Sequence, residues 1–288
     1  MADMEKAAAA AGIPLWKAIM EEDMKERSVS MQETMDKMRE RYHAMKQADE
    51  DYEQNLKSFS GLSGGDGANM HRFVREGEAV SGGFMGMVVT RALKMGESNA
   101  CMKRIVAAPT AGACGVVPAV FLTYEQFYRI PERTMIEGLF MAAGAGQVIA
   151  RRASISGAQG GCQAEVGTAS AMCAAALTSI RGGSNEQILS AGAFAMKSLL
   201  GLVCDPLGGL VEIPCIRRNV AGAVSAVAMA MAGILTRVPF DEVIDAMGEI
   251  GEMMPGGLKE TSQAGLAVTE TGKRVALDLA QRNQTPQC

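Results

Sequence analysis

Apolar residues dominate the chain from residue 80 onward, in segments that short glycine- or proline-containing breaks separate. Within these segments the apolar positions recur at helical spacing, and no stretch of more than a few residues alternates between apolar and polar as a half-buried strand would. The pattern predicts helices over about 83–102, 113–129, 132–152, 164–181, 185–201, 219–236, 241–252 and 258–281. We therefore expect a mainly α fold, a compact bundle of Ala/Gly-rich helices.

The first 59 residues differ, because charges flank their apolar positions. Ser30 and Glu33 form a capping-box pattern, and a stripe at spacings of four and three follows it: Met31, Met35, Met38, Tyr42 and Met45. We interpret residues 1–59 as an amphipathic helical arm that packs on its own domain or on a partner subunit. Residues 60–288 then form a second, helical domain. The Gly-rich residues 60–67 are either a linker or a loop over an active site.

Composition and charge narrow the class of protein. The 288 residues are 48% hydrophobic but only 5% aromatic, with 33 Gly and 22 Met, which suits closely packed helices with flexible filler residues. A net charge of −4 and a pI near 5.4 give no basic surface for nucleic acid. We therefore expect no nucleic-acid partner.

Membrane and export signals are weak. The uncharged stretch 221–235 is shorter than the roughly 20 residues that span a bilayer. The N-terminus lacks the basic-then-apolar order of a signal peptide, and seven irregularly spaced cysteines fit reduced thiols better than a disulfide framework. We expect a cytoplasmic protein with no membrane association.

Three cysteines lie in breaks between apolar segments. Cys162, Cys204 and Cys215 stand beside glycine or proline, where their thiolates can turn inward together and bind a soft metal centre. Three such ligands would leave one iron of a cubane cluster open to act as a Lewis acid. Their spacings match no ferredoxin or zinc-ribbon pattern, so spacing alone leaves the cluster open. The remaining cysteines within apolar segments are interpreted as small buried hydrophobes: Cys101, Cys114 and Cys173.

Three of the breaks open into predicted helices, so unpaired N–H groups and the helix dipole converge there on possible ligand sites. These breaks cover residues 108–115, 154–165 and 204–219. In the last of them, Asn219 is a natural N-cap.

Four long motifs in this region resemble one known family. They read AAPTAGACGVVPA (107–119), SISGAQGGCQAEVG (154–167), LVCDPLGGLVEIPCIRRN (202–219) and KETSQAGLA (259–267). Together they resemble the iron–sulfur-dependent L-serine dehydratases (L-serine ammonia-lyases), over roughly residues 60–270 and in the same order. The resemblance is closest to the separate alpha chain, because nothing here corresponds to the beta domain that other members carry fused in front.

The resemblance implies a [4Fe–4S] cluster on Cys162, Cys204 and Cys215, with the fourth iron open to L-serine. The implied activity is that of a carbon–nitrogen lyase, which converts L-serine into pyruvate and ammonia without pyridoxal phosphate. In some relatives a C-terminal cysteine folds back onto the open iron. Cys288 is therefore a possible fourth ligand, although an exposed thiol on the tail is the competing interpretation.

The general base is not identified by the sequence. The two histidines are His43, in the arm, and His71, after the Gly-rich loop; neither lies in a motif that resembles the catalytic pattern. The resemblance points to a histidine of the beta domain. It thus implies a beta-chain partner, a hetero-oligomer and an active site at the subunit junction. Within this chain, His71 is the candidate for the general base if no partner supplies it.

For the substrate carboxylate we expect Thr110 with the backbone amides that follow it, then Ser156 and Asn219. Arg217 or Arg218 could add positive charge there. Asp66 and Glu165 are expected to cap helices or pair with cations rather than catalyse. Two alternatives stay open at this point: a related iron–sulfur lyase acting on L-threonine or L-cysteine, and a non-catalytic iron–sulfur redox protein.

Overall fold

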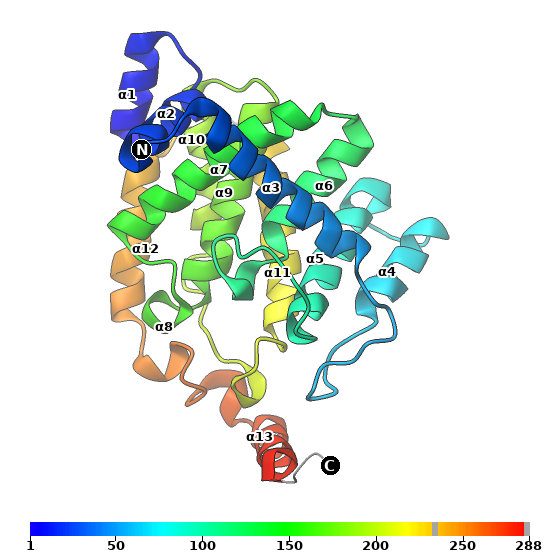
Figure 1. Ribbon diagram of the computed structural model, residues 1–288. Coiled ribbons are helices and arrows are strands. Elements are labelled where there is room, and N and C mark those ends of the chain that lie inside the picture. The colour runs from blue at the N-terminus through cyan, green and yellow to red at the C-terminus, as the bar shows by residue number, and fades with distance from the viewer. Residues whose placement is uncertain (232–235, 285–288) are drawn as a thin grey trace.

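The computed structural model describes residues 1–231 and 236–284, and α-helices make up most of this part of the chain (Figure 1). Their bounds are α1 Ala2–Ala11, α2 Leu15–Arg27, α3 Met31–Glu50, α4 Asp66–Arg75, α5 Gly82–Ala100, α6 Val116–Tyr128, α7 Glu132–Arg152, α8 Gly157–Gly160, α9 Thr168–Ile180, α10 Asn185–Lys197, α11 Cys215–Met231, α12 Phe240–Met253 and α13 Glu270–Gln284. Five short helical turns join them: η1 Ala111–Ala113, η2 Gln163–Gly167, η3 Leu207–Gly209, η4 Gly256–Leu258 and η5 Gly265–Val268. The described residues contain no β-strand, which confirms the mainly α prediction.

Helix α9 is the centre of the bundle, with α6, α7, α10 and α11 packed around it (Figure 1). Residues 168–178 of this helix are all buried, and most are Ala, Ser or Thr. Small side chains let neighbouring backbones approach closely, so a helix can bury its whole circumference with little aromatic volume. None of the helices in the described ranges combines the length and apolar character that crossing a bilayer requires.

The arm packs on this bundle. Leu15, Ile19, Tyr42 and Met45 are buried in the same apolar core as the central helices. The capping box at the start of α3 forms as predicted, because the Ser30 hydroxyl accepts from the N3 amide while the N3 carboxylate accepts from the Ser30 N–H. Of the two interpretations of the arm, packing on the chain's own core is therefore observed.

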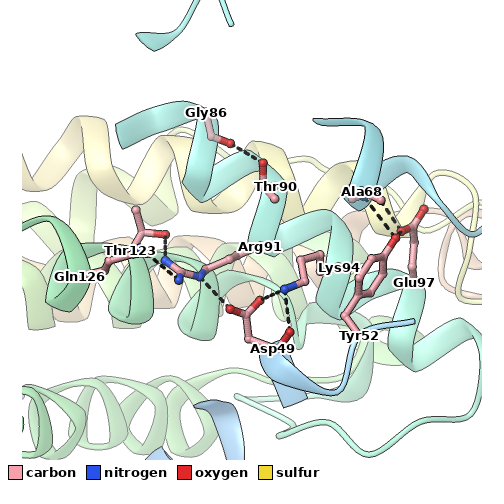
Figure 2. Close-up of polar contacts among 11 residues, drawn as sticks. Asp49, Tyr52, Ala68, Gly86, Thr90, Arg91, Lys94, Glu97, Thr123 and Gln126 are labelled. Carbon is pink, nitrogen blue, oxygen red and sulfur yellow. Dashed lines mark hydrogen bonds and ion pairs between the residues drawn. The ribbon is translucent and has the colours of Figure 1, made fainter. Parts of the chain in front are cut away.

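A partly buried polar network fastens the end of α3 to α5 and α6 (Figure 2). The carboxylate of Asp49 accepts from Arg91 Nε at 3.0 Å and from Lys94 Nζ at 2.6 Å. Arg91 also donates to the Thr123 hydroxyl at 3.0 Å, so one guanidinium connects three helices. Nearby, the buried carboxylate of Glu97 accepts from the first N–H groups of α4.

The predicted helix over 258–281 is wrong in its first half. The chain instead forms the turns η4 and η5 and becomes helical only at α13. The Cys204 N–H donates to the Leu258 carbonyl at 2.8 Å, and the Glu260 N–H donates to the Cys204 carbonyl at 3.1 Å. Glu260 and Ser262 have positive φ, which no continuous α-helix permits. Contact with a distant loop thus overrides the local helical pattern.

Candidate active site

The three predicted cysteines come from three separate breaks. Cys162 directly precedes η2, a short π-helical turn; Cys204 lies in the loop after α10; and Cys215 is the first residue of α11. Each is a free thiol, and their residues are 3%, 4% and 8% exposed. The breaks let each thiol leave its helix and turn into the protein.

The three thiols are close enough to affect one another electrostatically. Burial raises the pKa of Cys162 to about 11 and those of Cys204 and Cys215 to about 12. The Cys162 thiol contributes to the rise at both of the others. The structure therefore brings together the three cysteines that lie 42 and 11 residues apart in the sequence.

The three buried thiols are the candidate ligand set. Among the described residues, no three His, Cys, Asp or Glu side chains are placed to hold a single ion. Buried thiols are the soft ligands that an iron–sulfur cluster takes.

Arg218 supplies positive charge to this group. Burial lowers the pKa of its guanidinium, but the Cys162 thiol and the Asp205 carboxylate raise it more, so it stays charged. It donates to the Val203 carbonyl at 2.6 Å and to Asp205 at 2.8 Å. Asp205 in turn accepts from the Leu266 N–H at 2.8 Å. The Arg218–Asp205 ion pair thus connects Cys162, the loop that contains Cys204, and η5.

The Gly-rich loop after the arm contacts the cysteine loop. Glu212, between Cys204 and Cys215, is 4% exposed, and its carboxylate accepts from the hydroxyls of Ser58, Ser60 and Ser63. Behind this loop, Arg282 of α13 donates to the Phe59 and Ser60 carbonyls at 3.2 and 3.0 Å. A buried carboxylate surrounded by hydroxyl donors holds the loop against the site.

Asn219 is not an N-cap, contrary to the prediction, because α11 begins four residues earlier at Cys215. The residue is 2% exposed, and its amide group hydrogen-bonds within the protein. The amide oxygen accepts from the Gly115 N–H at 2.8 Å, while the amide nitrogen donates to the carbonyls of Gly112 and Cys215 at 2.8 and 3.0 Å. Asn219 therefore clamps the 112–115 loop onto the start of α11.

The other predicted substrate residues border the site. Thr110 precedes η1, and its hydroxyl is buried without a hydrogen-bond partner of ordinary geometry in the described chain. Ser156 precedes α8; its N–H donates to the Ser154 hydroxyl at 3.0 Å. Arg217, by contrast, is exposed and pairs with Asp66 at 2.7 Å, which confirms the pairing expected for Asp66.

The pairing or capping predicted for Glu165 is wrong. No ion pair joins its carboxylate to a cation of the described chain, and it caps no helix there. Burial is the main reason that the pKa of Glu165 is raised. Hydrogen bonding from the Thr110 hydroxyl opposes this rise, and the nearby Glu260 carboxylate adds to it. Glu165 also raises the pKa of all three cysteines, so its carboxylate lies within electrostatic reach of each thiol.

Neither histidine belongs to this group. His43 is exposed and lies 3.1 Å from the Glu132 carboxylate. His71 is exposed on α4; burial of its ring and the charges of Lys94 and Arg75 lower its pKa. Cys288 lies outside the described residues.

Sequence reasoning missed the supporting residues Asp205, Glu212 and Glu260. One signal was present for the first two. Both are isolated carboxylates among apolar, Gly and Pro residues between two candidate ligands, where a charge needs a specific partner. Glu260 gave no such signal, because a helical surface position explained it equally well.

Comparison with known proteins gives matches over most of the chain. A family model described as "Serine dehydratase alpha chain" matches residues 10–267. The "Probable L-serine dehydratase, alpha chain" of Bacillus subtilis is 48% identical over 225 residues, which cover 77% of this chain and 75% of that protein. The "L-serine dehydratase, alpha chain" of Peptoniphilus asaccharolyticus is 43% identical over 211 residues, 72% of each chain. "L-serine dehydratase 1" of Escherichia coli is 45% identical over 182 residues, 62% of this chain but only 40% of that longer one.

Proposed function

We propose that this chain, which belongs to the serine dehydratase alpha chain family, is the cluster-binding chain of an enzyme that deaminates L-serine to pyruvate and ammonia. The family is that of iron–sulfur L-serine dehydratases, which are carbon–nitrogen lyases. One observation carries the proposal: three buried thiols from three distant breaks converge beside Glu165, a carboxylate with no cation partner in the described chain.

Cys162, Cys204 and Cys215 would hold a [4Fe–4S] cluster. When bound, the cluster supplies a Lewis-acidic iron that eases departure of the serine hydroxyl. The chain's own part is to hold three thiolates in a dry site. Arg218 offsets their negative charge, and its bonds to Asp205 and the Val203 carbonyl fix the guanidinium in place.

The substrate carboxylate would bind at the two Gly-rich breaks. The hydroxyl of Thr110 is buried beside the Glu165 carboxylate, and Ser156 lies at the neighbouring break. Asn219, also expected to bind substrate, contributes indirectly in this proposal, because its amide is occupied in holding residues 112–115 against α11.

The general base would come from a beta-chain partner, which makes the active enzyme a hetero-oligomer. The similar B. subtilis and P. asaccharolyticus proteins are named as alpha chains, and the longer E. coli relative carries much sequence beyond the region matched here. His43 and His71 both lie away from the cysteines. Within the chain, residues 60–288 would form the catalytic domain and residues 1–59 the supporting arm. We place the enzyme in the cytoplasm, because all six described cysteines are free thiols.

The test is anaerobic purification of the chain with and without a co-expressed beta chain, followed by assays for iron, visible absorbance and pyruvate release. Cys204→Ala should lose iron and activity together. Cys173→Ala is the matched control: Cys173 is also fully buried but lies within α9, so both properties should be retained. An active, fully loaded Cys204→Ala protein would rule out this ligand set.

The partner's contribution is separable from the cluster's. The loaded chain alone should release pyruvate about 10²–10⁴-fold more slowly than the pair, which is the usual worth of general acid–base catalysis. Equal rates would place the base in this chain and make His71 the first residue to replace. Faster turnover of L-threonine or L-cysteine than of L-serine would reassign the substrate.

A further inference from the structure

Glu165 lies between the two Gly-rich breaks that border the cysteines. A Cβ atom on Gly112 would stand 2.9 Å from its Oε2 atom, and a Cβ on Gly157 would stand equally close. Both separations are shorter than real Cβ contacts, so a side chain at either position would displace the carboxylate from this place. The two breaks thus form a cradle that places one carboxylate beside the metal-binding thiols.

The charges around Glu165 leave its own charge uncompensated. The Glu260 carboxylate approaches from the opposite segment, with its Oε2 3.1 Å from the same Cβ position on Gly157. Arg218, the cation that acts on the Cys162 thiol, is already bonded to Asp205 and the Val203 carbonyl. Among the described residues no cation pairs with the Glu165 carboxylate, and the Thr110 hydroxyl beside it carries no charge, so this place lacks one positive charge.

An amino acid carries the missing charge. The α-carbon of L-serine carries an ammonium group with three N–H donors. The same α-carbon is bonded directly to the carbon that bears the reacting hydroxyl. The acceptors available in the cradle are the Glu165 carboxylate, the Glu260 carboxylate and the buried Thr110 hydroxyl oxygen. These three acceptors, two of them negatively charged, match the three N–H donors and the positive charge of an ammonium group.

We propose that Glu165 binds the α-ammonium group of the amino-acid substrate, with Glu260 as a second acceptor on the other side. This inference rests on the proposed function and deepens it. Glu165 then sets specificity: it selects free amino acids over hydroxy acids of the same shape. Binding the ammonium group also holds the carbon next to the reacting one in place, which orients the hydroxyl toward the three cysteines.

The test compares two ligands that differ only in the ammonium group, L-serine and 3-hydroxypropanoate, on the cluster-loaded enzyme with its partner. In Glu165→Gln, which keeps the side-chain shape, KM for L-serine should rise roughly 10- to 100-fold, the usual worth of a hydrogen bond to a charged group. The inhibition constant of 3-hydroxypropanoate should stay within about twofold or improve. A general disturbance of the site would instead weaken both ligands alike.

Two measurements guard against a structural explanation. Iron content and thermal midpoint of Glu165→Gln should equal those of the wild-type enzyme, and Glu252→Gln, an exposed position on α12, should change nothing. If Glu165→Gln fails to fold or to load iron, Glu260→Gln serves in its place, because Glu260 is exposed and should shift the same ratio by a smaller factor.

Parallel loss of both ligands, or an unchanged KM for L-serine, would overturn the inference. Failure of the proposed function looks different, because the wild-type enzyme would then release no pyruvate from L-serine whatever residue stands at 165.

Discussion

Replacing Asn219 with alanine should weaken the protein at the start of α11. The side chain makes three hydrogen bonds that are buried or partly buried, two of them to the loop that carries Cys114 and one to the backbone of Cys215. Each such bond contributes about 1 kcal/mol net, so the three together amount to about 3 kcal/mol. That is a large part of the roughly 5–15 kcal/mol by which a folded protein is ordinarily stable.

Thermal unfolding at matched iron content measures the effect. A loss of about 3 kcal/mol lowers the midpoint by roughly 6–12 °C in a domain of 150–250 residues, and this chain should lie near the lower figure because it is longer. Asn69→Ala is the control: Asn69 is exposed on α4, so its replacement should stay within about 0.5 kcal/mol.

Asn219→Asp tests the direction of these bonds. The aspartate keeps the acceptor for the Gly115 N–H but turns a carboxylate oxygen toward the carbonyls of Gly112 and Cys215, where the amide nitrogen stood. Two acceptors then face one another without a proton, so this variant should be at least as unstable as Asn219→Ala. An Asn219→Asp protein as stable as wild type would refute the clamp.

Two further predictions concern the stability of the protein. Asp49→Ala leaves Arg91 and Lys94 without their shared partner, so it should lower the free energy of unfolding in urea by about 2–3 kcal/mol. This loss is smaller than for a fully buried ion pair, because water reaches the network. The control Asp23→Ala removes an exposed ion pair within one helix and should lower the free energy of unfolding by less than about 1 kcal/mol. Burial raises the pKa of the Cys114 thiol from 9.0 to about 12. The stabilisation from burying the neutral thiol is therefore complete below pH 9 and is lost as the pH rises toward 12. Between these values the free energy of unfolding should fall by up to about 1.4 kcal/mol per pH unit. Unfolding curves between pH 8 and 11 should therefore be steeper in their pH dependence for wild type than for Cys114→Ala, and identical slopes would contradict the burial effect.

Local patterns in the sequence determined the elements that depend only on local contacts. The spacing of apolar residues predicted α7 at 132–152, and the Ser30 capping box predicted the start of α3, because helix periodicity and capping involve residues three or four positions apart. The three cysteines were singled out for the same kind of reason, since each lies where a helical run visibly breaks.

Tertiary structure decided what depends on residues far apart in the chain. Segment 258–268 has a helical pattern, but its backbone bonds to Cys204 and Asp205 hold it in turns instead. Asn219 resembles a helix cap until residues 112–115 are brought against it. Glu165 resembles a carboxylate that pairs with a cation, and only the folded chain surrounds it with glycines and another carboxylate. The sequence shows which groups could carry charge or bind metal, but most of the partners that set their roles come from packing between segments far apart in the chain.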